Sequence, residues 1–287
     1  MVVKQRDTVG LDVTKKKKIA GNQEKSIRDE EILSVCENIV CPNQSICLNQ
    51  GLSVFHIMGS YCSRTCTFCS GINSQPIPLD PDEPVNVANA VKRLRSRHVV
   101  LTSFSRDDLP NGGVDHIASA INAVHAINPG TSVEVIMHKC PTNKKAIKTI
   151  LDSSPEIITH NVMTVPRISP QLFDNTDYAC SIDFLETVRT MKSDVVVKSG
   201  LLLGLGENNY EVIRVMSDLY DAGCNCLTIG QHLPRSKKQI QPSRYVAPWE
   251  FFEYGHLSMQ MGYSSVRSGP FTCSSFDALN MYREIAE

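Results

Sequence analysis

Short apolar runs alternate with amphipathic stretches along most of this chain. The runs are rich in Val, Ile and Leu and lack strict polar alternation, as expected of parallel strands buried on both faces. They predict strands at 52–58, 98–103, 132–137, 157–161, 195–203, 226–230 and 264–266. The stretches between them have helical periodicity and predict helices at 85–96, 113–126, 143–152, 181–192, 210–222 and 248–261.

About six strand–helix repeats with short connections indicate a parallel sheet with helices outside it. No G-x-G-x-x-G motif follows the first strand, and polar residues gather at the carboxyl ends of the strands, where a barrel builds its site. We therefore expect an α/β fold: a partial (β/α)6 TIM-type barrel over residues 52–262.

The segments outside the barrel differ from it in pattern. Residues 1–30 are polar and aperiodic, which predicts a flexible N-terminal arm. A short helical pattern covers 29–40, and residues 31–51 form an N-terminal extension rich in cysteine. Residues 70–84 are rich in proline and predict a loop, and 263–287 form a C-terminal extension.

Composition and charge exclude several classes of function. The 287 residues carry a formal net charge of -1, which argues against a nucleic-acid-binding surface as the main function. No apolar run approaches the roughly 18 residues of a membrane span. The lysine run 15–18 is followed by no apolar segment, and Asp7 and Asp12 interrupt any mitochondrial presequence. We expect a cytoplasmic protein that binds neither nucleic acid nor membrane.

Cysteine usage points to metal. Of the eleven cysteines, six fall between Cys36 and Cys69. They form two trios, C-x4-C-x5-C at Cys36, Cys41 and Cys47, and C-x3-C-x2-C at Cys62, Cys66 and Cys69. In a reducing compartment such clustering indicates metal ligation rather than disulfides, and the five scattered cysteines read mostly as core thiols.

The second trio follows the first predicted strand directly. Three thiolates on one short loop can face a common point and leave a fourth metal position open, as a catalytic site requires. The alternative is a zinc knuckle, which usually has a fourth ligand at compact spacing. No Cys or His follows Cys69 until His98, so the pattern favours a [4Fe–4S] cluster.

With Phe68 on the same loop at the mouth of a β/α barrel, this spacing resembles the radical S-adenosylmethionine (SAM) superfamily. The resemblance implies that the amine and carboxylate of SAM bind the open iron. It also implies that reduction of the cluster cleaves the sulfonium to give a 5′-deoxyadenosyl radical. No side chain is then expected to be catalytic, because the cofactor supplies the radical.

The first trio makes the resemblance more specific. Its order and spacing look like those of lipoyl synthase, and the match extends over about residues 36–280. It includes Cys41-Pro42-Asn43 and the segments 106–113, 160–161, 164–167, 198–201, 204–207, 228–231, 244–246 and 268–270. The family inserts two sulfur atoms at C6 and C8 of an octanoyl group on a lysine of a carrier domain. Those C–H bonds are unactivated, so a radical is needed.

The resemblance also implies ligands, cofactors and partners. Two [4Fe–4S] clusters are expected; the second donates the sulfur and is held by the first trio and a serine, for which Ser274 is the expected residue. The expected partners are octanoylated lipoyl carrier domains (2-oxoacid dehydrogenase E2 or glycine cleavage H protein), an electron donor such as ferredoxin or flavodoxin, and an iron–sulfur carrier protein. The residues expected to bind SAM are Phe68, Ser103, Asn161, Lys198, Gly204 and Glu207.

The chain departs from the family at the C-terminal signature. The family has Arg-Ser-Ser-Tyr where this chain has Cys273-Ser274-Ser275-Phe276. Cys273 is either a rival thiolate ligand or a small buried thiol, and Ser275 is a further candidate. Acidic residues of the family are also missing near Cys140 and Met163. The alternatives are therefore a paralogous radical SAM sulfurtransferase or other radical enzyme with another substrate, a non-catalytic iron–sulfur carrier, and a zinc-binding structural module.

Overall fold

The computed structural model describes residues 33–34, 41–69, 72–73, 77–138, 140–141, 143–173 and 178–286. Its main sheet has eight strands: β1 (Leu33–Ser34), β2 (Leu52–His56), β5 (His98–Thr102), β6 (Ser132–Ile136), β7 (Ile157–Thr159), β8 (Val196–Leu203), β9 (Cys226–Gln231) and β10 (Ser265–Ser268). They lie in sequence order, β2 to β10 are parallel, and β1 is antiparallel to β2. The prediction of a partial barrel of parallel strands is confirmed.

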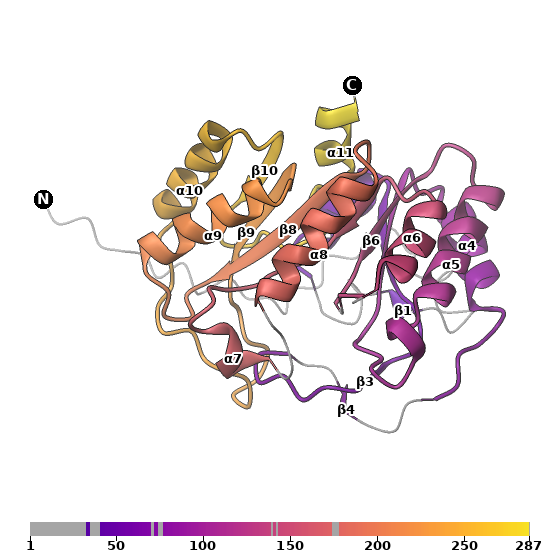
Figure 1. Cartoon of the computed structure of the whole chain (residues 1–287), viewed down its shortest axis with the longest axis horizontal. Helices are drawn as coiled ribbons and strands as arrows, with labels where there is room; N and C mark the ends of the chain where they lie inside the picture. Colours follow the sequence, from indigo (N-terminus) through magenta and orange to yellow (C-terminus); the bar gives the residue numbers. More distant parts are fainter. Residues whose placement is uncertain are drawn as a thin grey trace, which may run out of the picture.

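Six helices follow the strands in turn and cover the outer face of the sheet (Figure 1). They are α4 (Glu83–Leu94), α5 (Val114–Ile127), α6 (Lys144–Asp152), α8 (Tyr178–Met191), α9 (Asn209–Asp221) and α10 (Pro248–Met261). Local sequence fixes their starts. Asn143 accepts a hydrogen bond from the Ala146 amide at 2.7 Å, and Asn208 and Glu211 form a capping box at α9.

Alternation along each strand divides the side chains between two buried faces. Val99, Leu101, Val133 and Val135 belong to the main core with the outer helices. The next positions along each strand point to the inner face of the barrel. Helix α11 (Ala278–Ala286), which the sequence did not predict, packs on that inner face, where Met281 clusters with the three residues Ile157, Val196 and Cys226.

The short helix α3 (Gln44–Asn49) also belongs to the inner face. Its Cys47 clusters with Leu52, Val54, Val100 and Ala278, so α3 meets the start of α11 there. The predicted helix over 29–40 is wrong at 33–34, which form β1 instead. Pairing with β1 satisfies backbone groups that the edge strand β2 would otherwise expose. The other residues of that prediction lie outside the described residues.

Several short elements gather at the carboxyl ends of the strands: β3 (Tyr61–Cys62), β4 (Ile72–Asn73), the 3-10 turn η1 (Pro110–Gly112) and α7 (Ser169–Leu172). Figure 1 shows β3, β4 and α7 at one end of the molecule and α11 toward the other. The predicted loop over 70–84 holds for 77–82, but β4 and the start of α4 interrupt it.

The division into 1–30, 31–51, 52–262 and 263–287 stays a prediction, and residues 1–30 lie outside the described part of the chain. Among the described helices, none combines the length and the apolar character needed to span a membrane.

Candidate metal centres

The loop with the second cysteine trio begins just after β2. Met58 and Gly59 have φ values of 66° and 80°, and this left-handed turn leads the chain into β3 and Cys62. Cys62 is buried, Cys66 is half-buried and Cys69 is exposed. The loop therefore lies at the carboxyl end of the first parallel strand, as the sequence predicts, with its thiols spread from the protein interior to the surface.

Arg106 joins both ends of this loop. Its buried guanidinium donates to the Met58 carbonyl at 2.7 Å and to the Ile77 carbonyl at 3.0 Å, and it pairs with Asp108 at 2.9 Å. The structure gives Arg106 a specific role, because it fixes the backbone on either side of the three cysteines.

Further contacts hold the first half of the loop. The Ser63 amide donates to the Ser105 carbonyl at 2.9 Å, directly after β5. Arg64 forms an ion pair with Asp107 at 2.8 Å and a second hydrogen bond to the same carboxylate at 3.1 Å. Two parallel bonds of this kind orient both side chains.

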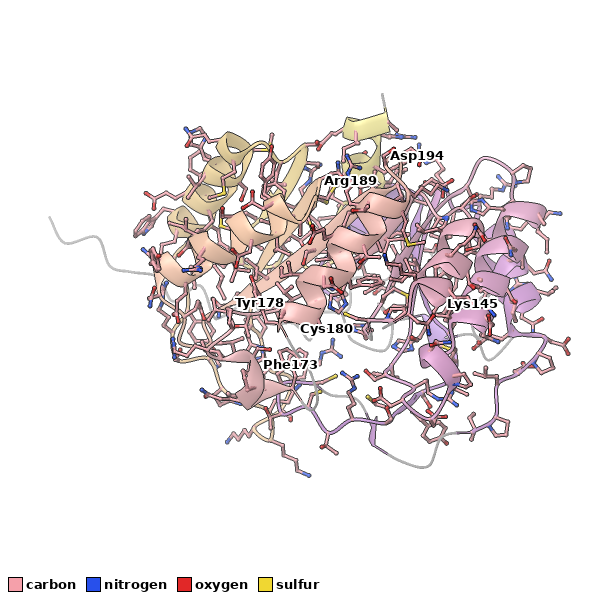
Figure 2. All side chains as sticks on the ribbon, viewed as in Figure 1. Lys145, Phe173, Tyr178, Cys180, Arg189 and Asp194 are labelled. Carbon is pink, nitrogen blue, oxygen red and sulfur yellow. The ribbon has the colours of Figure 1, made fainter. Side chains whose placement is uncertain are left out.

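The second half of the loop is held from the opposite side. The Thr67 amide donates to the Leu172 carbonyl of α7 at 3.2 Å. The Gln239 amide side chain donates to the Phe68 carbonyl at 2.8 Å. The Phe68 ring packs edge-to-face against Phe173 with centroids 4.6 Å apart; Figure 2 labels Phe173 at the end of α7. The prediction that Phe68 contacts SAM stays a prediction.

A second group of thiols lies between α3 and the C-terminal segment. Cys41 precedes α3 and Cys47 lies within it, and the Cys273 thiol interacts with the Cys41 thiol. Two long-range bonds hold these segments together: Asn43 donates to the Phe271 carbonyl at 2.7 Å, and Gln50 donates to Asp277 at 2.9 Å. Cys36 lies outside the described residues.

These thiols suit an iron–sulfur cluster chemically. Burial raises the pKa of the Cys47 thiol to about 11, so it stays neutral near pH 7 unless a metal stabilises its thiolate. Among the described residues, no three His, Cys, Asp or Glu side chains are placed to share one metal ion. Each cysteine of a [4Fe–4S] cluster binds a different iron atom, so such a cluster does not require them to share one.

Asn161 and Ser274 meet near the second group of thiols. The Ser274 hydroxyl donates to Asn161 Oδ1 at 3.0 Å. A Cβ at Gly200 would lie 2.7 Å from the same oxygen, so glycine there makes room for Asn161. Ser103, just after β5, lines a small pocket with Phe104 and His138. Asn161 and Ser103 therefore both lie at carboxyl ends of strands.

Glu207 organises the loop after β8. Its carboxylate accepts hydrogen bonds from the amides of Gly204 at 2.6 Å and Leu205 at 2.8 Å. Gly204 has φ 94°, and a Cβ there would lie 2.5 Å from the Arg244 carbonyl. The glycine is needed for both the backbone conformation and the close approach, and Glu207 fixes the resulting turn.

Lys198 does not reach the strand ends. It is fully buried on the inner face, where its Nζ lies 3.1 Å from both carboxylate oxygens of Glu134. Burial alone would raise the pKa of Glu134, but the charge of Lys198, with His98 Nε2 lying 3.6 Å from the carboxylate, holds it well below its ordinary value. The carboxylate that Lys198 meets is therefore Glu134 of the same barrel.

Sequence reasoning missed the residues that hold the C-terminal segment. Arg267 on β10 pairs with Asp277 at 2.7 Å and with Glu284 at 2.6 Å. Asp277 also accepts the bond from Gln50, so it joins β10, α3 and the start of α11. No periodicity or motif marks these residues, because their partners lie on separate elements.

Comparisons with known proteins match this architecture. The chain matches the Radical SAM superfamily over residues 56–219. It is 41% identical to the lipoyl synthase of Alkaliphilus metalliredigens over 85% of this chain and 84% of that protein. It is 40% identical to the lipoyl synthase of Caldanaerobacter subterraneus, covering 88% of each. For the lipoyl synthase of Coxiella burnetii the identity is 41%, over 88% of this chain and 81% of that protein.

Solved structures agree at the level of the fold. Methylornithine synthase superposes with a TM-score of 0.59 at 11% identity, covering 85% of this chain and 77% of that one. Streptococcus suis SuiB bound to its precursor peptide SuiA superposes with a TM-score of 0.60 at 10% identity, covering 86% of this chain and 52% of that one. At such low identity these similarities establish the fold alone.

Proposed function

This chain belongs to the lipoyl synthase family of the radical SAM superfamily, and from that membership we propose that it acts on an octanoyl group in amide linkage to a lysine of a lipoyl carrier domain. It is a sulfur-inserting radical SAM enzyme that uses SAM and [4Fe–4S] clusters. The proposed carriers are a 2-oxoacid dehydrogenase E2 or a glycine cleavage H protein. The reaction adds one sulfur at C6 and one at C8.

The cysteines divide between two clusters in this proposal. Cys62, Cys66 and Cys69 hold the first, leaving one iron for SAM. Cys41 and Cys47, with Cys36, hold the second. When bound, the first cluster and SAM supply the radical that removes hydrogen from unactivated carbon. From the sequence, Ser274 is the expected fourth ligand of the second cluster, and Cys273 and Ser275 are the alternative ligands.

Contacts among the described residues support this division. Arg106 and Gln239 hold the backbone of the first cysteine loop after β2. The bond between Ser274 and Asn161 ties the C-terminal segment to the end of β7. This juxtaposition is the observation that carries the proposal, because sulfur transfer requires the carbon radical and the sulfur donor to share one cavity.

SAM-contacting residues follow from the same placement. Ser103, Asn161, Gly204 and Glu207 lie after strands of the barrel, and Phe68 lies on the cysteine loop itself. We assign them to the SAM side of the cavity. Lys198 is assigned instead to the barrel interior with Glu134.

Two further protein partners and a location complete the proposal. Ferredoxin or flavodoxin provides the electrons, and an iron–sulfur carrier protein rebuilds the second cluster after its sulfur is consumed. The cytoplasmic location stays a prediction.

The test begins with anaerobic reconstitution of the full chain. Two clusters require about eight irons per chain, and about four would contradict the two-cluster assignment. The loaded protein is then incubated with SAM, a reductant and an octanoyl-lysyl carrier peptide. A peptide mass gain of two sulfurs minus two hydrogens is expected. Deoxyadenosine without that gain would indicate another substrate, and no deoxyadenosine would indicate a non-catalytic carrier.

Variants separate the two clusters. Cys66→Ala should abolish deoxyadenosine formation, because it removes a ligand of the first cluster. Cys41→Ala should leave some SAM cleavage but no sulfur insertion. Cys224→Ala removes a buried thiol away from both trios and is the matched control. If Cys41→Ala loses SAM cleavage to the same extent as sulfur insertion, separate roles for the two clusters would be contradicted.

A further inference from the structure

The C-terminal segment 271–277 lies directly against the barrel. The Gly269 amide donates to the Ile229 carbonyl of β9 at 3.0 Å, and the Thr272 carbonyl occupies the space that a Cβ at Gly230 would need. On its other side the segment accepts hydrogen bonds at Phe271 and Asp277 from the α3 region. Residues 273–275 are therefore fixed at both flanks, between β9 and the cysteines near α3.

Side chains at 273–275 alternate between two directions. Ser274 donates to Asn161 at 3.0 Å, toward the end of β7. Cys273 and Ser275 have Sγ and Oγ 3.8 Å apart, and the Cys273 thiol lies close enough to Cys41 for the two thiols to interact, which raises the pKa of Cys273. The thiol thus faces the cysteine group, whereas the Ser274 hydroxyl already has a partner in the barrel.

Ligand chemistry also favours Cys273 over the two serines as a ligand of the second cluster. Iron in these clusters prefers thiolate to oxygen donors. A thiol also loses its proton far more readily than a serine hydroxyl, so less free energy is needed to form the ligand. Cys47 lies in the same group, because its side chain packs in one cluster with Phe276 of the C-terminal segment and with Ala278 just beyond it.

We propose that Cys273, and not Ser274, is the fourth ligand of the second cluster, alongside Cys41 and Cys47. The inference rests on the proposed two-cluster function and makes it more specific. On binding, the Cys273 thiol releases its proton to solvent and the thiolate sulfur bonds to iron, with no change of oxidation state. A thiolate leaves iron less readily than an alkoxide, so this cluster resists dismantling more than one with a serine ligand.

The test uses the full chain with Cys62, Cys66 and Cys69 all changed to Ala, so that only the second cluster loads. Each variant, Cys273→Ser, Cys273→Ala, Ser274→Ala and Ser275→Ala, is made on this background. Three readouts are measured: iron and sulfide per chain, the Mössbauer spectrum, and the rate of iron loss to a chelator. Melting temperatures of the metal-free proteins show whether any variant is misfolded, and Cys224→Ala is the control.

We expect about four irons per chain in the background protein, all with sulfur-ligand Mössbauer parameters. Cys273→Ser should keep the cluster but convert one iron to an oxygen-ligated site. Cys273→Ala should lose iron to the chelator at least about tenfold faster, since loss of even an outer-shell partner typically weakens a metal site about tenfold to a hundredfold. Ser274→Ala and Ser275→Ala should leave spectrum and rate unchanged.

The opposite pattern would overturn the inference. If Ser274→Ala or Ser275→Ala loses iron and changes the spectrum while Cys273→Ala does not, a serine is the ligand. A background protein that binds no iron would contradict the two-cluster function itself, and this inference with it. The two failures are distinguishable, because the first still shows a loaded second cluster.

Discussion

The buried pair of Lys198 and Glu134 allows a quantitative test of the barrel interior. Both side chains have no exposed surface, and Lys198 Nζ lies 3.1 Å from each carboxylate oxygen. Thr159 adds a hydrogen bond to the same carboxylate at 2.6 Å. Lys198→Met keeps an unbranched side chain of similar length but removes the charge, leaving the carboxylate buried without its cation.

The loss in the free energy of unfolding can be estimated, because Lys198→Met can respond by protonating Glu134. Glu134 has an ordinary pKa of 4.5, and without Lys198 its burial would favour the protonated form. Holding such a carboxyl protonated at pH 7 costs about 1.4 kcal/mol per pH unit above its unfolded pKa, or about 3 kcal/mol. Removal of one partner of a buried ion pair costs about 3–5 kcal/mol, which agrees with this value.

The sign of the pH dependence identifies the cause. In the parent protein the pKa of Glu134 is lowered, so its stabilising effect is present above the unfolded pKa of 4.5 and is lost only in more acidic solution. In Lys198→Met the folded pKa is raised, so the variant gains stability as pH falls. The difference in the free energy of unfolding between the two proteins should therefore shrink from pH 7 to pH 5.

Urea denaturation of the metal-free proteins, followed by circular dichroism at pH 7, 6 and 5, measures this difference. Lys148→Met is the control, because Lys148 pairs with Asp152 with 64% and 61% of their side chains exposed; its cost should stay below about 1 kcal/mol. Glu134→Gln combined with Lys198→Met should recover much of the loss. A loss below about 1 kcal/mol, or one that does not shrink at pH 5, would refute the reasoning.

Three more predictions concern the cavity end of the barrel. Gly204→Ala should lower the free energy of unfolding by about 3 kcal/mol, since φ is 94° and the Cβ would collide with Gln231; urea denaturation measures it. Glu207→Gln should cost about 1–3 kcal/mol and weaken SAM binding by calorimetry, because one of the two backbone amides loses its acceptor and faces an NH2 donor instead. Arg106→Lys should lower iron loading toward about four per chain, because a lysine cannot reach both loop ends; full loading would contradict this role.

The strands and helices of the barrel could be predicted well, because the apolar periodicity that marks them depends on neighbouring residues in the sequence. The helix at 248–261 has the same bounds as α10, and every predicted strand from residue 52 onward exists. The start of α8 lies three residues earlier than predicted. The elements that were missed are stabilised by distant contacts: α11 packs through Met281 on strand residues of the inner face, and β1 has two residues.

The site was predictable where it depends on residue type and spacing. The two cysteine trios needed no structure to be recognised. The support around them could not be predicted, because Arg106 and Gln239 bind backbone carbonyls, which any residue type provides. Lys198 was expected to bind SAM, because the sequence could not show that Glu134 lies opposite it two strands away.

The bond between Asn43 and the Phe271 carbonyl joins residues separated by 228 positions. Closing a loop of that length in an unfolded chain costs roughly 5 kcal/mol of entropy, more than one hydrogen bond returns. The two segments meet because the intervening strands have already paired in order, each with its neighbour in sequence. The first half of the cysteine loop after β2 reaches its supports, Ser105 and Asp107, over separations of only 42 and 44 residues. We therefore expect the second group of thiols to assemble after the barrel, so that its metal enters a chain that has already folded.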